Sequence, residues 1–313
     1  MTQKGFYPHN GKWDTMLISE AVEAAGGDSS GWVVPDWTPE LDTAVNKRLG
    51  ITTAILSLTA PGACIVKDPQ ASAELARKTN EYAAKLRDER PNAYGFFAAL
   101  PNILNKEYAL KEIAYAYDVL KADGVTLFTR YGEDNHYLGH PDFQDIWAEL
   151  NRRSAVILVH PTHPVDTAQV SSLPQPIIRY PFETTQTAVN MLFNKTVRNN
   201  RNCKIILSHA GGALPYLISR PACTQPPEEL DAFWDDARNF YLDTALSGTE
   251  NVLHTLERFA KPGHILYGSD APYANVDIIN FHTSRLERYP FENPNLSAEI
   301  NRGNALTLFR RLK

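Results

Sequence analysis

The chain has 313 residues, of which 43% are hydrophobic and 21% charged, and this balance excludes a largely disordered protein. The chain has 31 lysine and arginine residues and 36 aspartate and glutamate residues, which gives a net charge of −5. It therefore lacks the excess of basic residues that a protein needs to bind nucleic acid as its main partner. The length suits one α/β barrel, which commonly needs about 250 residues.

Short apolar runs alternate with longer amphipathic segments along the chain. Most of these runs are continuous and too short for helices, which is typical of strands buried on both faces. They span residues 52–58, 94–100, 124–128, 155–160, 204–208, 239–243 and 265–268. Between them, apolar side chains recur at helical intervals in residues 69–88, 105–121 and 142–152. Strands that alternate with helices predict a parallel sheet.

Two folds build such a sheet, and the glycine pattern distinguishes them. A doubly wound sheet predicts a glycine-rich phosphate turn, but the sequence contains neither G-x-G-x-x-G nor G-x-x-x-x-G-K-[ST]. We therefore predict an α/β fold of the (β/α)₈ TIM-barrel type. The runs are one fewer than this barrel needs, so its first strand is expected to be short or missing.

The chain shows no internal repeat, low-complexity tract or Gly/Ser linker, so we expect one barrel domain over residues 1–313. Residues 219–237 contain a Pro-Pro pair and an acidic cluster. This composition predicts an excursion between the sixth and seventh strands.

The cysteines and the apolar runs also bear on location. Cys64, Cys203 and Cys223 are widely spaced without a C-x-x-C pair, which favours free thiols in a reducing compartment. The first residues lack the apolar stretch of a secretory signal. No apolar run approaches the ~18–20 residues that span a bilayer. We therefore expect a soluble, cytoplasmic protein that does not bind membranes.

Three predicted strands lead into a side chain able to bind a metal. One run ends in His160, the next is followed by His209, and the last leads to Asp270. Catalytic residues of such barrels lie at the carboxyl ends of strands. Two imidazoles and a carboxylate suit Zn²⁺ or Mn²⁺. A single histidine there is more often only hydrogen-bonded, but three such residues together favour a metal site.

Other polar residues near the strand ends leave alternatives open. Asp243 ends its run and either orients a ligand histidine or caps the following helix, which starts at Ser247 or Thr249. His136 and His140 flank a turn, from which either could reach the barrel mouth.

The combined motifs resemble the amidohydrolase superfamily, in its decarboxylase branch around 2-amino-3-carboxymuconate-6-semialdehyde and γ-resorcylate decarboxylases. Segment AAGGDSSGWVVPDW (residues 24–37) is similar to the 6-methylsalicylate decarboxylases of fungal aromatic polyketide pathways. The other matching segments are LSLTAPG (56–62), FAALP (97–101), LVHPTHP (158–164), YPFETTQTAVNMLF (180–193), ILSHAGGALPYL (206–217) and LYGSDAPY (266–273).

The N-terminus departs from that family. Its members open on a strand ending in His-x-His or Glu-x-Glu, followed by an aromatic residue and a proline. Residues 6–8 match that tail, so the ligand pair falls on Gln3 and Gly5, neither of which is a good ligand. Either the start is shortened or part of the site is lost. We expect weaker metal binding, and exposed edges on the strands at 52–58 and 265–268.

The resemblance implies a metal-dependent, non-oxidative decarboxylase (a carboxy-lyase) of a 2-hydroxybenzoate-type acid such as 6-methylsalicylate. Asp270 would be a metal ligand and the general acid, His160 a ligand, and His209 a ligand or a partner of Asp270. Arg130 would pair with a carboxylate, unless it is a solvated loop residue. Three aromatic residues would either contact the aromatic ring of the substrate or pack in the core: Phe128, Tyr180 and Phe182.

Two other functions remain open. A hydrolase of the same superfamily is disfavoured, because most hydrolytic members carry a bridging lysine on strand four and GVTLFTR (residues 124–130) has none. A degenerate, non-catalytic member would follow from Gln3 and Gly5. The resemblance further implies a homodimer or homotetramer, with a small aromatic carboxylic acid as its substrate.

Overall fold

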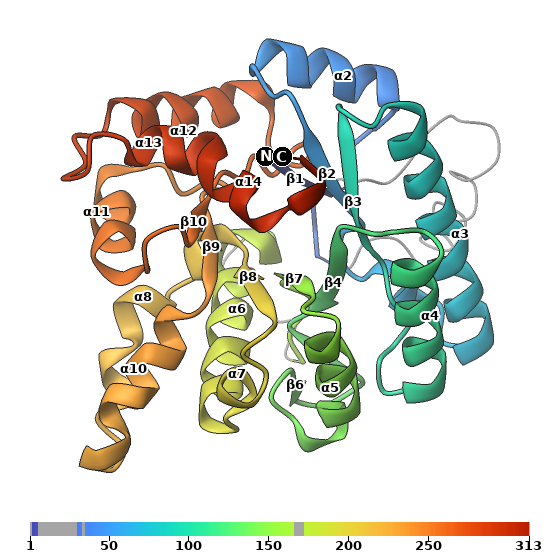
Figure 1. The fold of residues 1–313 in the computed structure, drawn as a ribbon, viewed down its shortest axis with the longest axis horizontal. Coiled ribbons are helices and arrows are strands. Elements are labelled where there is room, and N and C mark those ends of the chain that lie inside the picture. The colour runs from blue at the N-terminus through green and yellow to red at the C-terminus, as the bar shows by residue number, and fades with distance from the viewer. Residues whose placement is uncertain (1, 6–29, 33–34, 166–171, 313) are drawn as a thin grey trace.

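The computed structural model describes residues 2–5, 30–32, 35–165 and 172–312, with the side chains of residues 2–5 and 310 left out. Parallel strands form a curved sheet with helices packed around it (Figure 1), in the order β1-β2-β3-β4-β7-β8-β9-β10. The strands are β1 (Thr2–Gly5), β2 (Ala54–Ser57), β3 (Tyr94–Ala98), β4 (Gly124–Phe128), β7 (Val156–His160), β8 (Lys204–Leu207), β9 (Tyr241–Asp243) and β10 (Ile265–Leu266). This arrangement confirms the predicted barrel-type α/β fold.

The helices follow the strands along the chain. The longer ones are α2 (Pro39–Arg48), α3 (Pro69–Glu89), α4 (Lys106–Asp118), α5 (Gln144–Arg152), α6 (Gln175–Phe193), α10 (Leu230–Arg238), α11 (Glu250–Phe259) and α12 (Val276–Arg288). The shorter ones are α7 (Thr196–Asn199), α8 (Leu214–Leu217), α9 (Ser219–Ala222), α13 (Leu296–Ala298) and α14 (Asn304–Leu308). Single turns of 3₁₀ or π type lie at Gly62–Ile65, Pro141–Phe143, His209–Gly211, Pro227–Glu229, Glu299–Gly303 and Arg310–Leu312. None of the described helices is long and apolar enough to cross a membrane.

Local sequence explains where several helices begin. The side chain of Asp68 accepts a hydrogen bond from the N–H of Ala71, and Pro69 fills the first position of α3. Asn275 caps α12 in the same way through the N–H of Ile278. Amphipathic periodicity extends from these starts, so α3, α4 and α5 confirm the helices expected at residues 69–88, 105–121 and 142–152.

The first strand is short, as predicted, but it is not missing. β1 pairs in parallel with β2 in a register that sets Thr2 opposite Ala54 and Gly5 opposite Ser57. Ladder hydrogen bonds join main-chain groups, so a polar segment such as TQKG can add a strand at the end of a sheet. The expectation of an exposed edge on β2 is therefore wrong. In the described residues, β1 and β10 stand at the two ends of the strand order.

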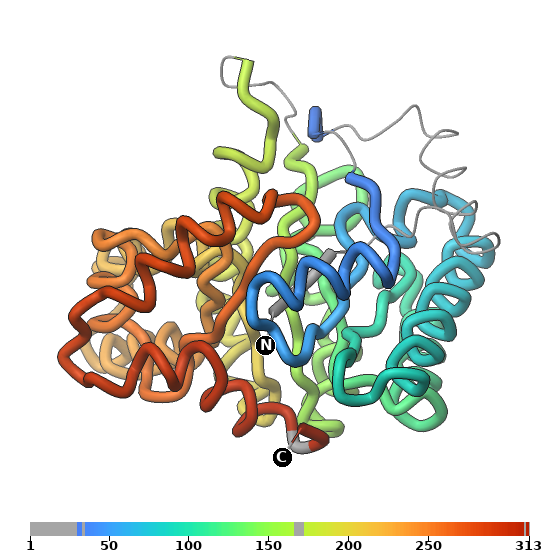
Figure 2. Tube along the Cα trace, turned by 90° about the horizontal axis from the view of Figure 1, so that it is seen from above, coloured from blue at the N-terminus to red at the C-terminus, as the bar shows by residue number. Residues whose placement is uncertain are grey.

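Among the described helices, the C-terminal end of α2 lies next to the N-terminal end of α12. Figures 1 and 2 both show α2 next to α12. A salt bridge joins Arg48 to Asp277 at 3.2 Å, and Val45 and Leu49 pack against a small cluster that includes Ile279. These contacts hold α2 and α12 together although Arg48 and Asp277 are 229 residues apart in the chain.

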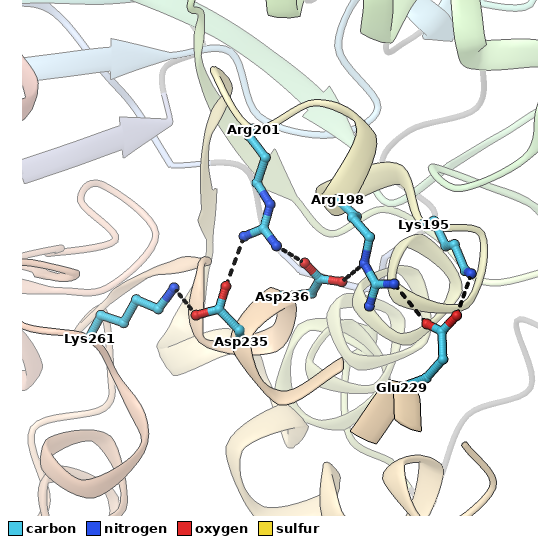
Figure 3. Close-up of polar contacts among 7 residues, drawn as sticks. All are labelled: Lys195, Arg198, Arg201, Glu229, Asp235, Asp236 and Lys261. Atoms are coloured by element: carbon cyan, nitrogen blue, oxygen red, sulfur yellow. Dashed lines mark hydrogen bonds and ion pairs between the residues drawn. The ribbon is translucent and has the colours of Figure 1, made fainter. Parts of the chain in front are cut away.

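The region expected as an excursion, residues 219–237, lies between β8 and β9 and contains α9, a 3₁₀ turn and most of α10. A chain of ion pairs fastens it to α7 and to the residues before β10 (Figure 3). At its centre, the buried carboxylate of Asp236 pairs with Arg198 and Arg201. The whole network comprises Lys195, Arg198, Arg201, Glu229, Asp235, Asp236 and Lys261.

Candidate active site

Four polar side chains come from the carboxyl ends of neighbouring strands. His160 is the last residue of β7, and His209 follows β8. Asp243 ends β9, and Asp270 follows β10. These strands are consecutive in the sheet. The fold thus brings the predicted residues His160, His209 and Asp270 to one end of the barrel, where such folds carry out their chemistry.

His160 is fixed as a neutral imidazole. Its Nδ1 donates a hydrogen bond to the carbonyl of Pro161 at 2.7 Å, which leaves the lone pair on Nε2. Burial, together with the nearby His209, lowers the pKa of His160 to about 4. The rings of Phe128 and Tyr180 lie roughly perpendicular to it, with centroids 6.2 and 6.5 Å away. The side chain is therefore poised to act as a nitrogen ligand.

His209 is held by both its ring and its main chain. Its Nδ1 faces the carbonyl of Ala245 at 3.2 Å, which again leaves Nε2 available. Its φ of 53° and that of Ala210, 58°, lie in the left-handed region that non-glycine residues seldom adopt. Strained conformations of this kind persist where the surrounding structure fixes them, and they cluster at functional sites.

Asp243 holds the turn that carries His209. Its Oδ1 accepts hydrogen bonds from the main-chain N–H groups of His209 at 2.9 Å and Ala245 at 3.0 Å. Thr249, not Asp243, occupies the N-cap position of α11. Of the two alternatives left open, capping is therefore wrong, and the contact to His209 reaches its main chain rather than its ring.

The same carboxylate has a second oxygen without a partner. Oδ2 of Asp243 is buried and makes no hydrogen bond within the described part of the chain. Burial raises the pKa of Asp243, while His209 opposes the rise. Burial likewise raises the pKa of Asp270, again against the effect of His209. The pKa of His160, of Asp243 and of Asp270 thus each depends in part on the nearby His209.

The donor atoms at this site are of the kinds that bind a divalent cation. Two imidazoles whose Nδ1 atoms already donate to carbonyls present Nε2 lone pairs, as metal-binding histidines commonly do. The unpartnered Oδ2 of Asp243 and the carboxylate of Asp270 add oxygen donors. His160, His209 and Asp270 do not form a set with all ligand atoms within 4.8 Å; among the described residues, only His136, His140 and Asp142 do. The side chain of Gln3 and all of residues 6–8 lie outside the described structure, and Gly5 has no side chain to offer a metal.

Two of the predicted ring-binding residues reach this site. Phe128 and Tyr180 are buried and flank His160. Phe182 is 51% exposed, and a residue two positions from Tyr180 on a helix faces a different direction. Phe128 and Tyr180 thus lie beside the candidate ligand His160, whereas Phe182 is half-exposed on another face of the helix.

Arg130 is engaged by the loop itself. Its Nε donates to the carbonyl of His163 at 2.8 Å, and one terminal nitrogen donates to the carbonyls of Gly132 at 2.8 Å and Asp134 at 3.0 Å. The guanidinium therefore joins two loops beside the barrel mouth.

Glu183 is a carboxylate that the sequence analysis did not single out. It accepts a hydrogen bond from the hydroxyl of Tyr137 at 3.0 Å. Its Oε2 is buried without a described partner, and burial raises its pKa. Its position three residues after Tyr180, on the same helix face, is the signal that would have identified it.

Comparison with known proteins identifies the family and its similar members. Residues 13–311 match a family model described as amidohydrolase. A 6-methylsalicylic acid decarboxylase of Aspergillus aculeatus is 53% identical, over 98% of this chain and 94% of that protein. A 6-methylsalicylic acid decarboxylase of Penicillium expansum is 48% identical, over 95% of this chain and 93% of that protein.

A solved structure shares the fold. The dihydroxybenzoic acid decarboxylase of Polaromonas sp. JS666, with bound manganese and the inhibitor 2-nitroresorcinol, superposes with a TM-score of 0.80. Its sequence is 21% identical, and the match covers all of this chain (100%) and 98% of that one. At this identity the likeness establishes the fold.

Proposed function

We propose, because the chain belongs to the amidohydrolase family, that it is a metal-dependent, non-oxidative decarboxylase of 6-methylsalicylate or a closely related 2-hydroxybenzoate. One observation carries the proposal: His160, His209 and Asp270 all lie at or after the carboxyl ends of strands β7, β8 and β10, at one end of the barrel. The two decarboxylases that are 53% and 48% identical support the substrate class.

His160, His209 and Asp270 would hold the metal, with Asp243 fixing the turn of His209. A divalent metal bound there would orient the carboxylate and hydroxyl of the substrate and stabilise negative charge. Phe128 and Tyr180 would contact the aromatic ring of the substrate. Phe182 is half-exposed, and Arg130 uses Nε and one terminal nitrogen to bind carbonyls, so the other terminal nitrogen would be the one to pair with a substrate carboxylate.

Asp270 would supply the proton. In the chemical step its carboxyl group protonates the ring carbon that bears the carboxylate, and a new C–H bond forms. The C–C bond to the carboxylate then breaks, its electron pair returns to the ring, and CO₂ leaves. From 6-methylsalicylate the other product is 3-methylphenol. Asp270 regains its proton from water, and the next turnover can begin.

The metal, the assembly and the location are finer proposals. Two imidazole nitrogens favour zinc, and manganese is supported by the Polaromonas enzyme. Half-exposed apolar side chains on α6 favour a homodimer or homotetramer in which they are covered. They are Ile177, Ile178, Phe182 and Phe193. The three free cysteines suit the cytoplasm.

The test is a direct assay of the purified chain after reconstitution with Zn²⁺ or Mn²⁺. We expect CO₂ and 3-methylphenol from 6-methylsalicylate, with loss of both after chelation. Salicylate, γ-resorcylate and orsellinate define the ring specificity, and 2-methylbenzoate, which lacks the hydroxyl group, serves as the negative control. A metal-loaded chain that releases no CO₂ from any of these hydroxybenzoates would overturn the proposal. Hydrolysis of an ester or lactone without decarboxylation would assign the chain to the hydrolases instead.

A further inference from the structure

A second cluster of metal-binding side chains lies in the loop after β4 and shares no residue with the candidate active site. The short antiparallel strands β5 (Arg130–Tyr131) and β6 (His136–Tyr137) lead there into the turn that precedes α5. Within the described residues, His136, His140 and Asp142 form the only set of three ligand atoms that all lie within 4.8 Å of one another. We propose that these three side chains bind a zinc ion that holds the hairpin to the start of α5.

The spacing of the ligand atoms matches a tetrahedral ion. Oδ2 of Asp142 lies 3.4 Å from Nε2 of His136 and 3.4 Å from Nδ1 of His140. Zinc bonds of about 2.0–2.1 Å, set at tetrahedral angles, separate neighbouring ligand atoms by roughly 3.3–3.4 Å. Two of the three separations between ligand atoms therefore match those around bound zinc, and the third lies within 4.8 Å. Nδ1 of His140 also accepts the main-chain N–H of Asp142 at 3.3 Å, a hydrogen bond that zinc would replace.

The ring of His136 is oriented as in many zinc sites. Its Nδ1 is hydrogen-bonded to Oδ1 of Asp134. Because the carboxylate accepts the proton of Nδ1, the lone pair is on Nε2, the nitrogen that faces Asp142. A carboxylate–histidine–zinc arrangement fixes the tautomer and raises the basicity of the ligand. Asp134 is therefore a positioning residue for this site.

The loop that carries the ligands is anchored before any ion binds. Between His136 and His140, the N–H of Leu138 donates to the hydroxyl of Thr187 at 3.1 Å, and the N–H of Gly139 donates to the side chain of Asn190 at 2.8 Å. These bonds tie the ligand loop to α6. An anchored backbone reduces the conformational entropy that metal binding must offset.

The ligand chemistry selects the ion. Two imidazole nitrogens and one carboxylate oxygen suit zinc, whereas calcium and magnesium prefer sites made entirely of oxygen. All three side chains are at least partly exposed, so water can take the fourth position. The expected occupant is therefore Zn²⁺ and not Mg²⁺, because Mg²⁺ prefers oxygen ligands.

The test counts zinc per chain. Metal-free full-length protein is equilibrated with buffered, micromolar free Zn²⁺, separated from unbound ion and measured by elemental analysis. We expect His140→Asn and Asp142→Asn each to hold about one equivalent less than the unchanged chain. Asp134→Asn is expected to lower the zinc affinity of the cluster by ~10–100-fold. Addition of Mg²⁺ in place of zinc should leave the cluster empty.

His254→Asn is the matched control, because His254 is an exposed histidine on α11 outside the cluster. It should retain the full zinc content. Circular dichroism of each variant reports folding, and Asp142→Asn, whose side chain is 57% exposed, is the variant least able to disturb the fold. Equal zinc content in the unchanged chain, His140→Asn and Asp142→Asn would overturn the proposal, whatever the decarboxylation assay gives.

Discussion

The main-chain N–H of His209 donates a 2.9 Å hydrogen bond to Oδ1 of Asp243, so the end of one strand fixes the turn after its neighbour. The same oxygen accepts the N–H of Ala245, whose carbonyl faces Nδ1 of His209. Asp243, Ala245 and His209 thus form a closed set of contacts. This set fixes both the position of the His209 main chain and the tautomer of its ring.

Asp243→Ala is expected to lower both stability and turnover. The substitution leaves two main-chain N–H groups without their acceptor, and each buried unsatisfied donor costs about 1–3 kcal/mol. We expect a loss of about 3 kcal/mol in the free energy of unfolding, measured by urea denaturation, and a fall in turnover of ~10–100-fold. Asp243→Asn keeps an acceptor oxygen and should lose less stability. Equal urea midpoints for the alanine variant and the unchanged chain would contradict this role.

Asp270→Asn tests the proton donor. The amide keeps the shape of the side chain but cannot release a proton to the ring carbon, so kcat should fall by ~10²–10⁴-fold. Asp277→Asn on α12 is a matched control, because that side chain is 88% exposed. The assay is CO₂ release at saturating substrate, with the metal content measured in parallel. Full turnover by a metal-loaded Asp270→Asn enzyme would eliminate Asp270 as the general acid.

The ion-pair network of Figure 3 makes unequal contributions to stability. Asp236 is 2% exposed and bridges two arginines, so Asp236→Asn leaves both with a weakened partner at a buried position. We expect a loss of about 2–3 kcal/mol in unfolding free energy. Asp235 is 53% exposed, and Asp235→Asn should cost no more than ~1 kcal/mol. Thermal or urea unfolding of the pair measures the difference, and equal losses would refute this ranking.

The three thiols should react at very different rates. Burial raises the pKa of Cys64 and of Cys203 to about 12, which suppresses the reactive thiolate near neutral pH. Cys223 is exposed. A thiol reagent added to the native protein should therefore modify Cys223 rapidly and the other two only after unfolding. Mass spectrometry of the labelled peptides gives the order, and rapid labelling of Cys203 in the native state would contradict it.

Local sequence patterns predict most of the strands and helices correctly. The continuous apolar runs form β3, β4 and β7, and the segment with helical periodicity forms α3. These patterns are visible in the sequence because each segment must bury its apolar face whatever it packs against. The sequence also placed His160, His209 and Asp270 at strand ends, since parallel strands align their carboxyl ends.

The groups that these segments contact, in contrast, depend on how the whole chain packs. The polar segment Thr2–Gly5 forms β1 because main-chain groups of β2 are available for pairing, and the sequence of the segment itself does not indicate this. The contact of Asp243 with the main chain of His209 depends on the turn after a neighbouring strand. His136 and Asp142 meet through a hairpin of two-residue strands, too short to leave a periodic signal. The hydrogen bonds that hold these loops and turns come from residues distant in the chain, such as Thr187 and Asn190 on α6, so the local sequence does not predict them.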